Sequence, residues 1–208
     1  MALPRRNRSF SPIPGTEPPR RGLFVDRWGT LLELPDGSFP RFEAVRWIPG
    51  AIDALFRASS ASWNVYLIGN EDEVAQGRVP DAEWQEFESA LLAHLRGHGI
   101  TIARNYACLE DVERGAGKHR RDSVFRLPDT GIFFHAEQHD GVQLRHSFVV
   151  GDTTLEIAAG GRAGCKTIGV ATGRGCRDGE LHVEPEIRCA NLAEAVELFR
   201  SSESLAAG

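Results

Sequence analysis

The sequence predicts an α/β fold, a doubly wound parallel sheet with helices on both faces. Short apolar runs alternate with longer segments of helical character, as expected for strands that are covered on both sides. The chain has 208 residues, of which 41% are hydrophobic, so it is long enough to bury one sizeable core. No internal repeat interrupts the alternation, and we expect one α/β domain.

The strands and helices are expected in a regular order. Apolar runs are expected to form strands at Leu23–Val25, Val65–Ile68, Ile100–Ala103, Phe148–Val150 and Thr167–Val170. Helices are expected at Pro49–Ala58, Asp81–Gly97, Gly131–Asp140, Leu155–Ala163 and Asn191–Arg200. The longest helix has typical start residues in Pro80 and Asp81 and typical stop signals in Gly97 and Gly99. The order is Rossmann-like.

Three residues stand at the ends of expected strands. Asp26 and Gly69 directly follow apolar runs, and Asp152 follows another run by way of one glycine. In a doubly wound sheet, ligands bind beyond the carboxyl ends of the strands. We therefore expect these three positions to border one ligand site.

The most specific motif is the pentad Asp26-Arg27-Trp28-Gly29-Thr30. It resembles the Asp-x-Asp-Gly-Thr catalytic turn of the haloacid dehalogenase (HAD) superfamily of phosphohydrolases, except that Trp28 stands in place of the second carboxylate. In that superfamily the first Asp attacks phosphorus and forms an acyl phosphate. The second protonates the leaving oxygen and later activates water. The resemblance implies Asp26 as the nucleophile, and it leaves the chain without the general acid, because an indole cannot shuttle that proton.

A second landmark resembles the metal-binding strand end of the superfamily. There the family has Gly-Asp followed by another acid four residues later, and here Asp152 and Glu156 occupy those places. One further family ligand is the backbone carbonyl two residues after the nucleophile, which survives any substitution at Trp28. Magnesium prefers such oxygen ligands. The resemblance implies a Mg²⁺ site made of Asp26, the Trp28 carbonyl, Asp152 and Glu156.

The turn from Gly69 to Gly77 has diverged further. It is close to the Thr-Asn-Gln-Ser-Gly-x-Ala-Arg-Gly turn of capless superfamily members, which include the heptose bisphosphate and histidinol phosphatases. Gly69 replaces the hydroxyl residue that holds the phosphate. The resemblance leaves Asn70, together with Gly29 and Thr30, as the expected phosphate-binding residues. The acidic run at residues 71–73 is expected either to be a solvated loop or to bind a cationic partner.

The catalytic lysine of the family also has no counterpart. The run from Arg126 to Ile132 resembles the Arg-Lys-Pro-x-Pro-Gly-Met segment of the same capless members, and Leu127 replaces the lysine that neutralises nucleophile and phosphate. Lys118, Arg126 and Lys166 are the candidate substitutes. Arg126 is the best placed of them by sequence.

Zinc is not expected. Many of these relatives have a zinc loop with two cysteine-containing pairs, and only Cys108 has a counterpart here. The four cysteines include no Cys-x-x-Cys pair and are expected to be reduced thiols. Two histidine pairs have the i, i+4 spacing of a helical metal site, His94/His98 and His135/His139. Neither has an evident third ligand, and we interpret both as scaffold residues.

The resemblance covers residues 22–200, which are expected to form a HAD-like domain without a large cap. Residues 1–21 contain five prolines and five arginines and are expected to form an extended arm. The arm is either a solvated tail or a docking segment for a partner or a second copy of the chain. Residues 201–208 are expected to form a flexible tail.

Composition limits the classes of partner. The net charge is −5 at pH 7, and the folded part shows no basic cluster of the kind that binds nucleic acid. The apolar runs are too short to cross a bilayer, and the N-terminus lacks a hydrophobic secretory segment. We expect a cytoplasmic protein without nucleic-acid or membrane partners.

Two classes of function remain open. The favoured one is a degenerate HAD protein that keeps the nucleophile and the Mg²⁺ carboxylates, hydrolyses little or nothing, and acts as a binding or assembly subunit through its arm or capless face. The alternative is an atypical Mg²⁺-dependent phosphohydrolase or phosphotransferase. It would act on a sugar phosphate or similar small ester, with Asp26 as nucleophile.

Overall fold

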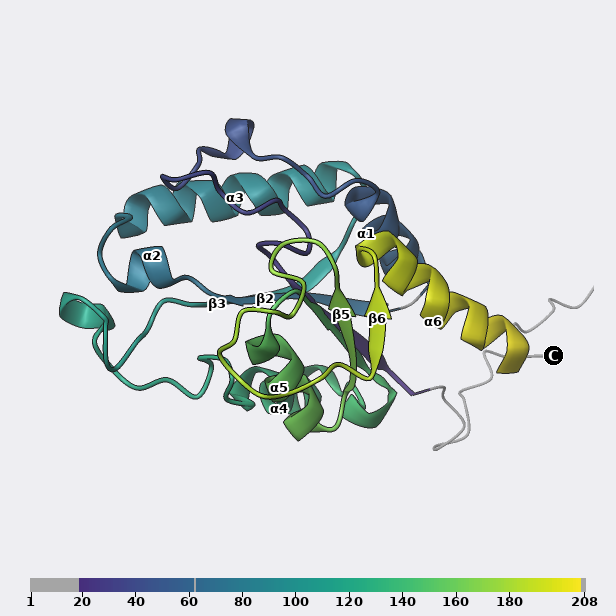
Figure 1. Ribbon diagram of the computed structural model, residues 1–208. Helices are drawn as coiled ribbons and strands as arrows, with labels where there is room; N and C mark the ends of the chain where they lie inside the picture. Colours follow the sequence, from purple (N-terminus) through teal and green to yellow (C-terminus); the bar gives the residue numbers. More distant parts are fainter. Residues whose placement is uncertain (1–18, 62, 207–208) are drawn as a thin grey trace, which may run out of the picture.

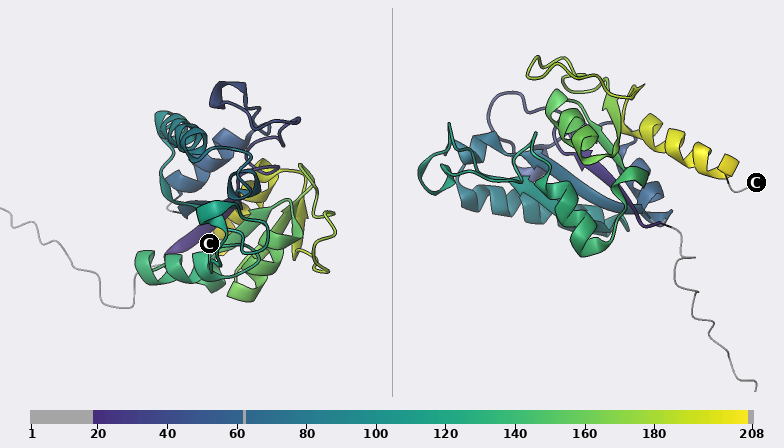
Figure 2. Two further views of the ribbon diagram at one scale, coloured as in Figure 1. Left: turned by 90° about the vertical axis from the view of Figure 1, so that its left-hand side faces the viewer. Right: turned by 90° about the horizontal axis from the view of Figure 1, so that it is seen from below.

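The computed structural model describes residues 19–61 and 63–206. They form a six-stranded sheet in the order β3-β2-β1-β4-β5-β6, and every neighbouring pair of strands is parallel. Helices cover both faces of this sheet (Figures 1 and 2). The doubly wound α/β class is therefore confirmed.

The elements have the following bounds. The strands are β1 (Arg21–Asp26), β2 (Trp63–Asn70), β3 (Ile102–Cys108), β4 (Phe148–Gly151), β5 (Lys166–Val170) and β6 (Ile187–Cys189). The α-helices are α1 (Ala51–Ser60), α2 (Asp72–Ala75), α3 (Asp81–Gly97), α4 (Gly131–Asp140), α5 (Thr154–Ala163) and α6 (Leu192–Ala206). Three single 3₁₀ turns are η1 (Phe42–Ala44), η2 (Gly117–His119) and η3 (Leu144–His146).

Two edge strands differ from expectation. Strand β3 begins later than expected and continues through Arg104 and Asn105, whose polar side chains bond to Asp140 and Glu88 at the sheet edge. Strand β6 was not expected, because its three residues include the charged Arg188 and give no apolar run. Pairing to a neighbour, rather than local composition, defines both strands.

The chain ends also refine the domain boundaries. Most of the expected arm, residues 1–18, lies outside the described residues, and β1 begins at Arg21. Helix α6 continues to Ala206, so the segment expected to be a flexible tail is mostly helical. Within the described residues, no helix combines the length and apolar content that a membrane crossing requires.

Strand β1 divides the core into two layers. Leu23 and Val25 face the layer beneath α1, α3 and α6, whereas Phe24 faces the layer beneath α4 and α5. This alternation is the two-residue period of a strand, and all three side chains are fully buried. Figure 1 shows these helix groups on opposite sides of the sheet.

The sheet order places a crevice at one edge. Strand β1 pairs with β2 on one side and with β4 on the other, in a register that sets Val25 opposite Val150. The strands that follow β1 in sequence are added first on one side of it, as β2 and β3, and then on the other, as β4, β5 and β6. Such a switch point opens a crevice beyond the carboxyl ends of the strands. Asp26 and Asp152 are therefore carried to neighbouring positions.

Helix α5 packs closely on β4, and its two central glycines allow a test. A Cβ atom on Gly160 would lie 2.5 Å from the Val149 Cγ2 atom, whereas a Cβ on the exposed Gly161 would meet nothing closer than 3.9 Å. We expect Gly160→Ala to lower the free energy of unfolding by about 1–3 kcal/mol, because the stiff, buried valine cannot withdraw. Gly161→Ala should raise it by about 0.5–1 kcal/mol through helix propensity. Urea unfolding measures both, and equal stabilities would contradict the packing argument.

Candidate active site

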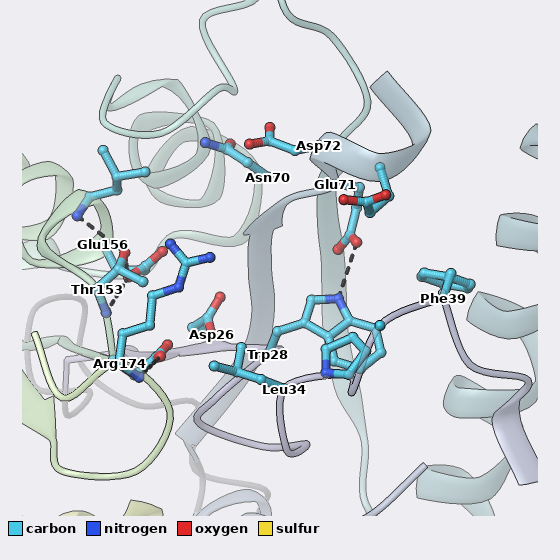
Figure 3. Close-up of a pocket in the computed structure, with 15 residues that line it drawn as sticks. Asp26, Trp28, Leu34, Phe39, Asn70, Glu71, Asp72, Thr153, Glu156 and Arg174 are labelled. Carbon is cyan, nitrogen blue, oxygen red and sulfur yellow. Dashed lines mark hydrogen bonds between the residues drawn. The ribbon is translucent and has the colours of Figure 1, made fainter. Parts of the chain in front are cut away.

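A cavity of about 380 Å³ opens beyond the carboxyl ends of β1, β2 and β4. One side carries the carboxyl groups of Asp26, Asp152 and Glu156. The lining also includes the apolar side chains of Trp28, Leu34, Pro35 and Phe39 and the acidic residues Glu71, Asp72 and Glu73. Figure 3 shows Glu156 and Arg174 on the side away from Trp28 and Phe39, with Asp26 between them.

Asp26 and Asp152 form the floor of the acidic side. They are 5% and 0% exposed, and both line the same cavity. Asp152 Oδ2 accepts a hydrogen bond of 2.7 Å from the backbone N–H of Arg174. Asp26 Oδ2 and Asp152 Oδ1 are buried and have no hydrogen-bond partner among the described residues. The structure places these two acids in one cavity, and their catalytic and metal-binding roles stay predictions.

Two glycines enclose the Asp152 carboxylate. Gly29 and Gly173 have φ values of +87° and +57°, and a Cβ on either would fall within 2.2 Å of the Asp152 Oδ2 atom. Any larger residue would therefore displace the carboxylate. These glycines bring backbone against the acid and fix its position.

Burial makes the acids hard to ionise. It raises the pKa of Asp26 well above its ordinary value, and the charges of Glu156 and Asp152 raise it further, whereas Arg27 lowers it. Burial likewise raises the pKa of Asp152 and brings that of Glu156 to about 7. A group of like charges in a low-dielectric site attracts a cation strongly.

Glu156 has a structural task as well. Its Oε2 atom accepts hydrogen bonds from the Thr153 backbone N–H, at 3.0 Å, and from the Thr153 hydroxyl, completing a capping box at the start of α5. The described residues contain no group of three or more His, Cys, Asp or Glu side chains arranged to hold a metal ion. The candidate metal ligands are therefore Asp26, Asp152 and the Trp28 carbonyl. Glu156 is less available, because its Oε2 atom accepts the capping hydrogen bonds of α5. Two carboxylates are sufficient for Mg²⁺, which keeps several waters.

Trp28 is anchored where the family has its acid. Its Nε1 donates a hydrogen bond of 3.2 Å to Glu71 Oε2. Its ring stacks on Phe87, with centroids 5.4 Å apart, and meets Phe39 edge-on at 5.9 Å. The indole closes one wall of the pocket and cannot donate the proton that a carboxylic acid would supply.

Sequence reasoning missed a buried ion pair behind this wall. The Arg27 guanidinium is 0% exposed, pairs with Glu71, and donates to Asn105 Oδ1 at 2.6 Å. A Cβ at Gly69 would lie 3.0 Å from Arg27 Nη1 and 3.3 Å from Asp26 Oδ1. Arg27 therefore occupies the space that a hydroxyl side chain at position 69 would enter. The sequence did contain a signal for this pair: Arg27 follows the first apolar run, and Glu71 follows the second.

The acidic run at residues 71–73 is neutralised from within the chain. Its ion pairs are Glu71 with Arg27, Asp72 with Arg126 and Arg114, and Glu73 with Arg78. The expectation of a solvated loop is corrected, because Glu71 is buried and Asp72 and Glu73 begin α2. A cationic partner is not needed to balance these charges. The chain's own arginines are the partners.

None of the expected lysine substitutes reaches the pocket. Arg126 is held between Asp72 and Asp111, at 2.8 and 3.0 Å. Lys118 pairs with the Asp81 carboxylate, and Lys166 lies at the amino end of β5 over the Phe148 ring. No cavity-lining atom comes from these three cations.

The expected phosphate-binding residues have few free donors. The Gly29 N–H donates to the Leu32 carbonyl at 2.6 Å, and Thr30 is fully buried. Asn70 lines the pocket, but its amide exchanges two hydrogen bonds with the Leu127 backbone, at 2.8 and 2.9 Å. Leu127 itself is 2% exposed and packs in the core layer beneath α4 and α5. The phosphate-binding roles of these residues stay predictions.

The histidine pairs and cysteines lie elsewhere. His94 stacks on Trp47, and His135 Nδ1 lies 2.9 Å from the Tyr106 hydroxyl, so these two are packed against the scaffold, whereas His98 and His139 are exposed. All four cysteines are buried and free, which agrees with the expected reduced thiols. Burial raises the pKa of Cys165 and of Cys176 to about 12, so neither is a ready nucleophile.

The Arg27–Glu71 pair can be tested by a double-mutant cycle. Arg27→Met should lower the free energy of unfolding by about 3–5 kcal/mol, because it leaves the Glu71 charge buried without a partner. The double variant with Glu71→Gln should recover a large part of that loss. Arg78→Met, which breaks the exposed pair with Glu73, is the control and should cost about 0–1 kcal/mol. Additive losses in urea unfolding would argue against the pair.

Comparisons with known proteins agree with this geometry. A family model described as HAD-hydrolase-like matches residues 124–195. The D-glycero-beta-D-manno-heptose-1,7-bisphosphate 7-phosphatase of Pasteurella multocida is 26% identical over 156 residues, which are 74% of this chain and 84% of that protein.

Solved structures share the fold. The D,D-heptose 1,7-bisphosphate phosphatase of B. bronchiseptica, solved with magnesium and phosphate, superposes with a TM-score of 0.75 at 23% identity, over 88% of this chain and 99% of that one. A HAD-like phosphatase from Mesorhizobium loti gives a TM-score of 0.70 at 26% identity, over 90% and 88%. By the matched family model and these relatives, the chain is similar to phosphatases of the HAD superfamily, and it shares their fold.

Proposed function

We propose that the pocket binds Mg²⁺ and a small phosphate ester, and that the chain hydrolyses the ester at least about 10²-fold more slowly than a superfamily member with a general acid. The observation that carries this proposal is the pair Asp26 and Asp152. Each holds a buried carboxylate oxygen without a partner among the described residues. Burying a polar atom without a partner costs free energy, and a bound ion or ligand would remove that cost.

Mg²⁺ fits the donor set of the pocket. Asp26, Asp152 and the Trp28 carbonyl would hold the ion, which would offset the charge of the acids and of a phosphate. Asp26 lies at the end of β1, where its carboxylate faces the pocket. It is thus placed to attack a phosphorus atom that is held above it.

The proton is the missing element. Attack by an Asp26 oxygen would form the acyl phosphate and break the ester P–O bond, and the leaving alkoxide would have to take its proton from water. Trp28 offers only an N–H that is already donated to Glu71. General acid–base help typically contributes about 10²–10⁴-fold, so its loss supports a binding protein with residual turnover. An assembly role through the N-terminal arm remains a prediction from the sequence.

A second candidate function is hydrolysis of a sugar phosphate at a useful rate. Two observations favour it: the nucleophile and metal carboxylates are intact, and the relatives of known name act on heptose 1,7-bisphosphate. In this case the substrate or a bound water would supply the proton that residue 28 cannot.

Turnover of a panel of sugar phosphates with Mg²⁺ distinguishes the two candidates. We expect slow phosphate release that Asp26→Asn abolishes, and an increase of about 10²–10⁴-fold in Trp28→Asp, which restores the acid. Trp28→Phe is the control, since it removes the N–H without adding an acid. Fast turnover of the unaltered protein, lost in Asp26→Asn, would establish the second candidate instead.

Thermal unfolding with and without Mg²⁺ tests the metal site. We expect MgCl₂ to raise the Tm of the unaltered protein, because an ion that binds only the folded state stabilises it. Asp152→Asn should remove this shift. Without metal, its Tm should equal or exceed that of the unaltered protein, since one of several repelling carboxylates is gone. Glu73→Gln, at an exposed acid paired with Arg78, should keep the shift. An equal shift in Asp152→Asn would remove Asp152 from the site.

A further inference from the structure

Among the described residues that line the pocket, Arg174 is the one arginine, and it comes from the loop after β5. Its backbone N–H donates to Asp152 Oδ2 at 2.7 Å. The loop around it is closed by a 3.1 Å hydrogen bond from Gly175 N–H to the Thr172 carbonyl, and Cys176 N–H donates to the Asp152 carbonyl at 2.5 Å. The backbone of Arg174 is thereby fixed relative to the paired aspartates.

The side chain of Arg174 points into the pocket. Figure 3 shows its guanidinium extending toward the gap between Asp26 and Glu156. Its charge also lowers the pKa of Asp152, against the larger effect of burial. Arg27, Arg78, Arg114 and Arg126 are by contrast all held by carboxylates of residues 71–73. Among the described residues, the Arg174 guanidinium has no ion pair within 4 Å.

We propose that Arg174 is the phosphate-binding cation of this pocket and does the work of the lysine that Leu127 replaces. The inference rests on the proposed function and deepens it by naming the group that recognises a phosphate monoester. A guanidinium can donate two parallel N–H bonds to phosphate oxygens, which gives orientation as well as charge. The Arg174 guanidinium would approach a bound phosphate from the β5 side. Arg126 cannot take this role, because it is paired with Asp72 and Asp111.

Affinity for inorganic phosphate tests the assignment. The full chain is titrated with phosphate at saturating Mg²⁺, and separately with Mg²⁺ alone, by calorimetry. Arg174→Met should weaken phosphate binding by about 10–100-fold, the range expected for a lost hydrogen bond to a charged group. Its Mg²⁺ affinity should stay equal or rise, because a positive charge near the carboxylates is gone. Arg174→Lys should fall between, since an ammonium lacks the fork.

The neighbouring Arg177 provides the matched control. It is exposed on the same loop, donates its N–H to the Arg174 carbonyl at 3.1 Å, and does not line the cavity. Arg177→Met should keep the phosphate affinity of the unaltered protein. An unchanged affinity in Arg174→Met, or an equal loss in both variants, would overturn the assignment while leaving the proposed function standing. Failure of the unaltered protein to bind phosphate with Mg²⁺ would overturn both.

Discussion

The pairing of β1 with β4 is the constraint on which the site depends. It sets Val25 opposite Val150, and the next residues bring two buried carboxyl groups together at 5% and 0% exposure. Like charges in such a place raise one another's pKa and favour whatever cation can enter. Gly29 and Gly173 give up side chains so that the backbone can close around Asp152. Burying these carboxyl groups together costs folding free energy, which a bound cation or ligand would offset.

The departures from the family pattern are connected through contacts rather than independent. Arg27 takes the space that a side chain at position 69 would fill, and its buried charge requires the Glu71 carboxylate. Glu71 in turn accepts the Trp28 N–H. A hydroxyl residue at position 69 alone would therefore disturb this ion pair, because its side chain would meet the Arg27 guanidinium. We interpret these four positions as one connected network centred on the buried Arg27–Glu71 ion pair.

The fold and the paired aspartates could be predicted from the sequence, whereas the charge partners could not. Apolar runs of strand length mark β1, β2, β4 and β5, and residues directly after them reach a common edge. Which arginine meets which acid depends on tertiary distances. Arg126 looked suitable beside the missing lysine, yet Asp72 and Asp111 hold it. Arg174 gave no signal, because its role depends on a loop folded against Asp152. Strand β6 was missed because pairing alone defines it.

Leu127 shows why the lysine cannot be replaced from its own segment. Its side chain is buried in the core layer beneath α4 and α5, and its backbone is tied to the Asn70 amide. A charge at this position would have to leave that layer, and a buried ammonium without a partner is strongly unfavourable. Arg126, one residue earlier, is already neutralised. A cation for the acidic side must therefore enter from another element, and the β5 loop is the one that brings an arginine side chain to the cavity. In this arrangement Arg174 supplies the positive charge on the β4–β5 side of the pocket, and Trp28 and Phe39 supply an apolar wall.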